Sequence, residues 1–111
     1  MKIFLDDERN PNFLFIFGFE PEDYSDMVVI RNSQDMIEHV KIHGMPTYIS
    51  FDHDLGGDDT SRVFIKWLID ELLDGRITLP TDFGYFVHSQ NPIGAKWIRE
   101  VMADLIMEFG V

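Results

Sequence analysis

Four short apolar runs alternate with longer segments whose apolar residues recur every three or four positions. The short runs, residues 2–5, 27–31, 47–52 and 83–87, are rich in β-branched and aromatic residues, and we expect strands there. The longer segments run from Gln34 to about His43, from Asp59 or Thr60 to about Asp74, and from Pro92 to Gly110, and they predict helices. This alternation predicts an α/β fold, a three-layer sandwich around a short, mostly parallel sheet of about four strands.

Capping residues define the expected helix boundaries. Ser33 is a suitable N-cap for the first long helix, and Gly44 is a suitable stop. The last helix begins with Asn91 as its cap and Pro92 at its first position. Residues 10–26 are harder to assign, because the phenylalanines at 13, 15, 17 and 19 alternate as in a strand or hairpin. Apolar residues also fill the gaps at 14 and 16, so a buried loop or a short helix suits this stretch equally well.

Three of the four predicted strands end in polar, ionisable residues. The first runs into Asp6-Asp7-Glu8-Arg9, the third into Asp52-His53-Asp54, and the fourth into His88-Ser89-Gln90-Asn91-Pro92. Right-handed crossovers and a strand order of 2-1-3-4 set these ends side by side at one edge of the sheet. That edge is where open parallel sheets bind ligands, and we expect the functional site there.

Composition narrows the class of protein. The 111 residues suit a single domain spanning 1–111, with 45% hydrophobic residues for its core. No apolar stretch approaches a membrane span, and the early acidic residues argue against a secretory signal, so we expect a cytoplasmic protein. The chain has no cysteine, which leaves oxygen and imidazole as ligands for any metal.

The net charge of −11 argues against a surface that holds long nucleic acid by itself, because the chain has 9 basic residues and 20 acidic ones. A small phosphorylated ligand bound through a metal is compatible with this charge. A basic protein partner is also compatible, since such a field would steer it.

Carboxylates crowded at one edge need a compensating cation. Oxygens of Asp6 or Asp7 together with Asp52 suit Mg²⁺, whereas Mn²⁺ or another imidazole-tolerant metal is favoured if His53 and His88 also reach the ion. Ser89, Asn91 and the first turn of the last helix offer groups that attract phosphate, and Gly94 would leave room for its approach.

The polar residues around these motifs also have purely structural interpretations. Asp58 and Asp59 suit turn and helix-cap positions, and Glu8 with Arg9 suits a solvated ion pair. His39 and His43 suit the exposed face of a helix.

The acidic pair Asp6-Asp7 and the later Asp52 resemble the metal-binding and phosphoryl-accepting groups of receiver domains. The chain is still more similar to cyclic-phosphate processing receiver-like domains, through L-D-D-E-R-N-P at 5–11, S-F-D-H-D-L-G at 50–56 and H-S-x-N-P at 88–92. This resemblance implies a receiver-like (flavodoxin-like) fold and a metal-dependent phosphoesterase acting on cyclic phosphates of nucleotides or RNA ends. The chain departs from ordinary receivers, because a fifth strand and its terminal Lys are missing and an aromatic stretch at 12–19 replaces the first helix.

A scheme for hydrolysis assigns a role to each candidate residue. Asp7 and Asp52 hold the metal, Asp6 or Asp54 orients the attacking water, and His53 or His88 protonates the leaving oxygen. Ser89, Asn91 and Arg9 bind the substrate. Two other classes stay open: a signalling or adaptor domain that binds Mg²⁺ or accepts a phosphoryl group at Asp52, and a small acidic protein that binds and inhibits a partner.

Overall fold

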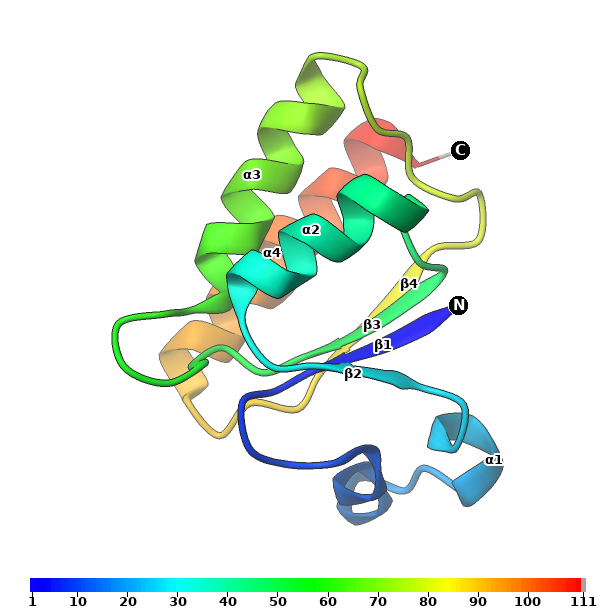
Figure 1. Cartoon of the computed structure of the whole chain (residues 1–111), viewed down its shortest axis with the longest axis vertical. Helices are drawn as coiled ribbons and strands as arrows, with labels where there is room; N and C mark the ends of the chain where they lie inside the picture. Colours follow the sequence, from blue (N-terminus) through cyan, green and yellow to red (C-terminus); the bar gives the residue numbers. More distant parts are fainter. Residues whose placement is uncertain (111) are drawn as a thin grey trace.

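The computed structural model describes residues 1–110 and places four parallel strands in one sheet. The strands are β1 (Lys2–Leu5), β2 (Val28–Ile30), β3 (Tyr48–Phe51) and β4 (Gly84–Val87), in the order β2-β1-β3-β4 (Figure 1). The predicted α/β fold and the strand order 2-1-3-4 are therefore confirmed. Every pairing in the ladder is parallel, so all four strands point their carboxyl ends at the same edge.

Three long helices cover one face of the sheet, and two short ones lie on the other (Figure 1). The long helices are α2 (Ser33–His43), α3 (Ser61–Leu73) and α4 (Pro92–Phe109). The short ones are η1, a 3-10 helix over Pro11–Phe17, and α1 (Pro21–Tyr24). Among residues 1–110, none of the helices has the combination of length and apolar character that a bilayer crossing requires.

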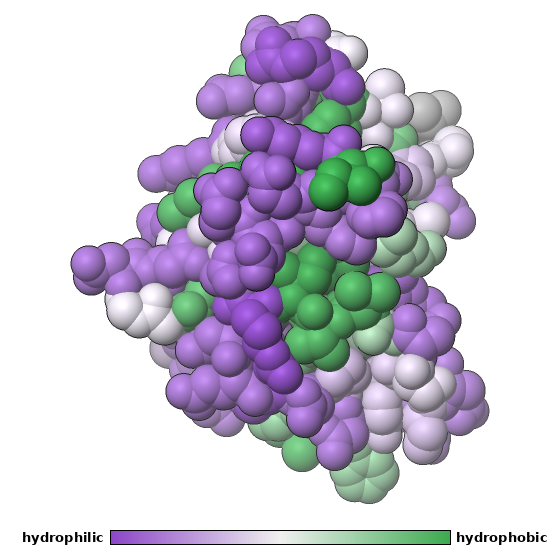
Figure 2. All heavy atoms as spheres, viewed as in Figure 1, coloured by the Kyte–Doolittle hydropathy of each residue, from purple (hydrophilic) through white to green (hydrophobic). Residues whose placement is uncertain are grey.

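Alternation along the strands separates the two faces. Side chains such as Ile3, Leu5 and Phe51 face the long helices and join their apolar residues in the main core. Each such side chain, when fully buried, contributes about 1.5–3 kcal/mol to folding. The outer surface seen in Figure 2 is largely hydrophilic, with a hydrophobic group near the middle of the view.

The opposite face of the sheet packs against the aromatic segment. Phe17 and Phe19 both contact Phe86 edge to face, at ring-centroid distances of 5.2 and 5.0 Å. Residues 11–17 form a 3-10 helix, so of the open alternatives the short helix is correct and the strand or hairpin is wrong. Pro11 opens this helix, and Gly18 closes it with φ of +90°, a conformation that favours glycine.

The helix caps follow the sequence prediction with one shift. Asn91 caps α4, and its Oδ1 accepts the backbone N–H of Gly94 at 3.0 Å. Helix α2 is capped by Asn32, whose Oδ1 accepts the Asp35 N–H at 2.8 Å, so the assignment of Ser33 as N-cap is wrong by one residue. Ser33 is instead the first helical residue, and its polar groups have a distant partner.

That partner is Asp59, in the loop that leads into α3. The Asp59 carboxylate accepts the Ser33 backbone N–H at 2.8 Å and also accepts the Ser33 hydroxyl. Thr60 is the N-cap of α3, so Asp59 ties the start of α2 to this loop and does not cap its own helix. Asp58, its neighbour in the loop, is exposed.

We expect Asp59→Ala to lower the free energy of unfolding by about 1–3 kcal/mol, because it leaves the buried donors of Ser33 unpaired. Asp58→Ala removes the same charge from an exposed position and should change it by less than about 0.5 kcal/mol. Urea denaturation of both variants measures the difference. Equal losses for the two variants would contradict this assignment.

The start of α4 packs closely on the end of β3 through Gly94. A Cβ at Gly94 would lie 2.3 Å from Cγ of His53, so only glycine leaves space for this buried imidazole. From the sequence, Gly94 was expected to leave room for the close approach of a phosphate. That interpretation is wrong, because the ring of His53 fills the space.

Gly94→Ala should therefore destabilise the protein by about 1–3 kcal/mol through overpacking. The usual effect has the opposite sign, because alanine inside a helix is roughly 0.5–1 kcal/mol more favourable than glycine. In a His53→Ala background the added methyl group meets no ring, so Gly94→Ala should become neutral or stabilising there. A double-mutant cycle by urea denaturation tests this, and an unchanged cost in both backgrounds would refute the contact.

Candidate functional site

The register of the sheet brings three predicted site residues into one row. Asp6, Asp52 and His88 each directly follow a strand whose last residues pair across the ladder. The backbone N–H of Asp52 donates to Leu5 at 2.9 Å, and that of His88 donates to Phe51 at 2.9 Å, which extends the ladder by one residue. One ligand atom from each of Asp6, Asp52 and His88 lies within 4.8 Å of the others, which is close enough to share one cation.

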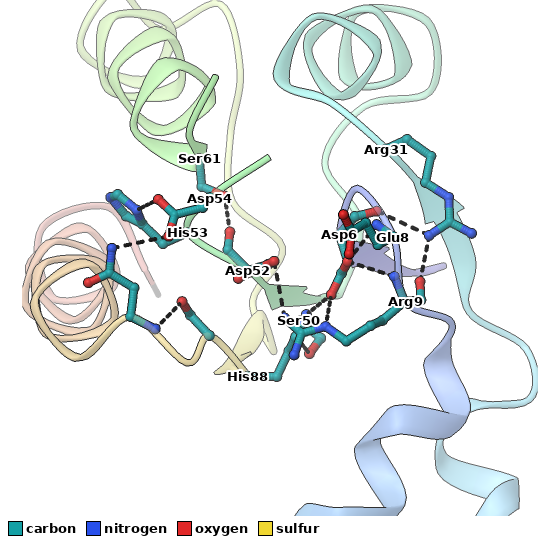
Figure 3. A network of polar contacts seen from close by, with 12 residues as sticks. Asp6, Glu8, Arg9, Arg31, Ser50, Asp52, His53, Asp54, Ser61 and His88 are labelled. Atoms are coloured by element: carbon teal, nitrogen blue, oxygen red, sulfur yellow. Dashed lines mark hydrogen bonds and ion pairs between the residues drawn. The ribbon is translucent and has the colours of Figure 1, made fainter. Parts of the chain in front are cut away.

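Asp6 is a fully buried carboxylate that accepts four hydrogen bonds (Figure 3). Its Oδ1 accepts the backbone N–H groups of Glu8 and Arg9, both at 2.8 Å. Its Oδ2 accepts Nε of Arg9 at 2.9 Å and lies 3.0 Å from Nε2 of His88. Burial alone would raise the pKa of Asp6, but the bond from His88, the backbone amides and Arg9 together hold it well below its usual range.

The guanidinium of Arg9 bridges Asp6 and Asp52. While Nε bonds Asp6, Nη2 donates to Oδ2 of Asp52 at 3.2 Å. The guanidinium also lies over the ring of Phe13, 4.1 Å from its centroid, and Arg31 donates to the Arg9 carbonyl. The expected solvated ion pair between Arg9 and the adjacent glutamate is thus wrong, since Arg9 pairs with the two buried aspartates.

Asp52 has a less favourable environment than Asp6. Burial raises the pKa of Asp52, and the negative charge of Asp6 raises it further. Arg9, His88 and a hydrogen bond with Ser89 lower it only in part. A cation placed beside Asp52 would therefore stabilise its ionised form.

His88 is the third member of this row, and its whole ring is buried. Its ring stacks on Phe4 with centroids 4.4 Å apart, and Nδ1 lies 2.7 Å from Oγ of Ser50. Because Asp6 is held ionised, Nε2 of His88 carries the proton and donates it to Asp6. Within the row, His88 is thus bonded to Asp6.

His53 contacts the site in a parallel way, through Asp54. Nε of Arg62 donates to Nε2 of His53 at 2.9 Å, so the proton of the neutral ring resides on Nδ1. Nδ1 then donates to Oδ1 of Asp54 at 2.9 Å, and Nδ2 of Asn91 donates to Oδ2 at 3.1 Å. The bonds from His53 and Asn91 lower the pKa of Asp54, whose side chain is 60% exposed.

An open cavity of about 690 Å³ lies over this edge of the sheet. Its lining includes most of the predicted site residues: Asp6, Asp7, Arg9, Asp52, Asp54, Ser89 and Asn91, with Glu8, Gly56, Gln90 and Pro92 beside them. His53 and His88 are buried, 6% and 0% exposed, and the cavity is lined by other residues. Asp7 lies against Gly56, whose φ of +88° belongs to the tight loop after β3.

Four residues that hold the site residues in place were not predicted from the sequence. Ser50 positions His88, Ser61 donates to the Asp52 carbonyl, Arg62 sets the tautomer of His53, and Arg31 anchors Arg9. A serine inside an otherwise apolar strand was a usable signal for Ser50. Arg62 and Arg31 had no comparable signal, because their partners lie 9 and 22 residues away in the chain.

Comparison with known proteins places the chain in a family. Neither the curated proteins nor the solved structures gave a significant match. The family model described as cyclic-phosphate processing receiver domain matches residues 1–104, which include every strand and every cavity residue named above. The chain therefore belongs to the cyclic-phosphate processing receiver domain family.

Proposed function

We propose that this protein is a metal-dependent phosphoesterase that processes cyclic phosphates of nucleotides or RNA ends. The observation that carries the proposal is the composition of the cavity. Its lining contains the carboxylates of Asp7, Asp52 and Asp54 and also Ser89 and the N-terminal residues of α4. Such a site pairs ligands for a hard cation with groups that attract phosphate.

The residues present fit a divalent ion. Burial and the charge of Asp6 raise the pKa of Asp52, so a nearby cation would stabilise its ionised form, and carboxylate oxygens are the ligands that Mg²⁺ and Mn²⁺ prefer. Asp52 and Asp7 would hold the ion, which would supply Lewis acidity at the phosphate.

Asp54 is our candidate for orienting the attacking water. It is the most exposed carboxylate whose position is fixed by two hydrogen bonds at the cavity, from His53 and Asn91. A charged acceptor held in place can align a water molecule for attack. Asn91 bonds Asp54 and caps its helix, and we assign the binding of phosphate oxygens to Ser89 and Arg9, which also line the cavity.

We propose that both histidines position carboxylates, His88 through Asp6 and His53 through Asp54. Each ring nitrogen of both residues already has a partner in the fold. Proton donation by His53 or His88 to the leaving oxygen stays a prediction from the sequence, and a changed pH–rate profile in His53→Gln would support it.

We expect Asp54→Asn to reduce hydrolysis of a 2′,3′-cyclic nucleotide by about 10²-fold or more, the scale for losing acid–base help, while the fold is kept. Asp58→Asn, on the same loop but with no place in the site, should stay within about twofold of wild type. Rates measured over several cyclic phosphates with Mg²⁺ and Mn²⁺ give the comparison.

The same panel of cyclic phosphates and metals distinguishes the phosphoesterase from a signalling domain. If the protein turns over none of these substrates while binding metal, the phosphoesterase proposal fails. Incubation with acetyl phosphate followed by intact mass then tests the alternative, in which Asp52 accepts a phosphoryl group. A stable adduct that disappears in Asp52→Asn would identify a phosphoacceptor.

Metal should stabilise the fold, because an ion that binds only the native state raises its unfolding free energy. At a concentration 100 times the dissociation constant this gain is about 2.7 kcal/mol. We expect Mg²⁺ or Mn²⁺ to raise the Tm of wild type and Asp52→Asn to lose most of the shift. Scanning calorimetry with and without EDTA measures both, and an equal shift in the two proteins would place the ion elsewhere.

A further inference from the structure

We infer that Arg9 is an internal counter-cation that competes with the divalent ion for Asp52 and is released towards the phosphate when the ion binds. This inference rests on the proposed function, since it concerns the same site. Its basis is the location of the guanidinium, which bridges the two buried aspartates at 2.9 and 3.2 Å. A positive charge thus already stands where the crowded carboxylates require one.

The two ends of this bridge are unequal. Asp6 has four donors on its two oxygens, including both backbone amides of the turn, so its demand for hydrogen bonds is met. Asp52 receives a longer bond, 3.2 Å, from Nη2 of Arg9 and a hydrogen bond from Ser89, so it has fewer donors than Asp6. Asp52 is therefore the group over which the guanidinium and an ion compete.

Simultaneous binding of both cations is unfavourable. A divalent ion on Asp52 would take the carboxylate that Nη2 now contacts and would repel a guanidinium a few ångströms away. The side chain of Arg9 has room to respond, because it is 27% exposed and lines the cavity. Its backbone would stay in place, held by Asp6 through the Arg9 N–H and by Arg31 through the Arg9 carbonyl.

Release of the guanidinium would make the affinities for metal and for phosphate depend on each other. An unbridged Arg9 at the cavity is a bidentate donor suited to phosphate, whereas the bridged one is committed to carboxylates. Metal binding should thus raise the affinity for a phosphate anion, and phosphate should raise the affinity for metal by the same factor.

The first test is metal affinity. Arg9→Gln should bind Mn²⁺ about tenfold tighter than wild type, within the ~5–150-fold range of typical coupling between sites. Lys41→Gln removes the same charge from the last turn of α2, towards the opposite edge of the sheet, and should change the affinity less than twofold because distant surface charges are screened (Figure 1). Electron paramagnetic resonance of free Mn²⁺ gives each dissociation constant.

Several results would overturn the inference. One is Mn²⁺ binding by Arg9→Gln that is no tighter than binding by Lys41→Gln, and another is the absence of Mn²⁺ binding by wild type at millimolar concentration. If circular dichroism shows that Arg9→Gln does not fold, Arg9→Lys replaces it. That variant keeps the charge, but a single ammonium cannot span both carboxylates as the guanidinium fork does, so it should bind Mn²⁺ tighter by a smaller factor.

The second test observes the side chain itself. In nitrogen–proton spectra of wild type, saturating Mg²⁺ should shift the Nε–H signal of Arg9 and speed its exchange with water. The Nε–H signal of Arg62, bonded to His53, is the internal control and should change little. An Arg9 signal that stays unchanged while Mg²⁺ binds would also refute the release.

These measurements need no turnover, so the two proposals can fail separately. Tighter Mn²⁺ binding in Arg9→Gln without any hydrolysis would leave the inference standing and remove the phosphoesterase. Hydrolysis in wild type, with metal affinity unaltered in Arg9→Gln, would support the phosphoesterase and refute the inference about Arg9.

Discussion

The ionised carboxylate of Asp6, fully buried at the end of β1, is the constraint on which the rest of the site depends. A charge removed from water is tolerated only where donors replace the lost hydration. Here the turn after β1 supplies two amides, Arg9 supplies a guanidinium nitrogen, and His88 supplies a ring N–H. Satisfying this one group therefore dictates the path of the chain after β1, the direction of the Arg9 side chain, and the burial of the histidine that follows β4. The stacked Phe4 and the hydroxyl of Ser50 then complete the surroundings of that histidine.

Two neighbouring aspartates acquire opposite properties because these donors are shared unevenly. Most of them go to Asp6, whose pKa is lowered, whereas Asp52 is left with burial and a negative neighbour, which raise its pKa. Environments that push the pKa values of paired carboxyl groups apart are a feature of catalytic sites. This difference separates the roles that we propose for the two aspartates. Asp6 stays with the fold, and Asp52 is the carboxylate whose charge a bound cation would relieve.

Much of this arrangement could be predicted from the sequence, and the missing part has a physical cause. Strand ends, helix periods and the 2-1-3-4 order place Asp6, Asp52 and His88 at one edge, because parallel strands that end in register expose their next residues side by side. The sequence could not tell which side chains face the cavity. His88 and His53 do not line it, because one ring nitrogen of each bonds Asp6 or Asp54. The other bonds Ser50 or Arg62, partners 38 and 9 residues distant. The aromatic stretch stayed ambiguous for a similar reason, since its 3-10 helix is set by packing on Phe86 and not by local periodicity.

A protein of net charge −11 can attract a phosphate only if positive potential is concentrated locally. This fold offers two sources at one cavity, the N-terminus of α4 and the guanidinium of Arg9, and the proposed divalent ion on the carboxylates would be a third. They are not independent, because Arg9 neutralises the carboxylates that would hold the ion. In the bridged state the cavity lacks both the ion and an uncommitted guanidinium, so the acidic surroundings should repel anions. When the ion replaces Arg9 at Asp52, the cavity gains the charge of the ion and an uncommitted guanidinium together. Anion binding would therefore depend on metal more steeply than the charge of the ion alone would cause.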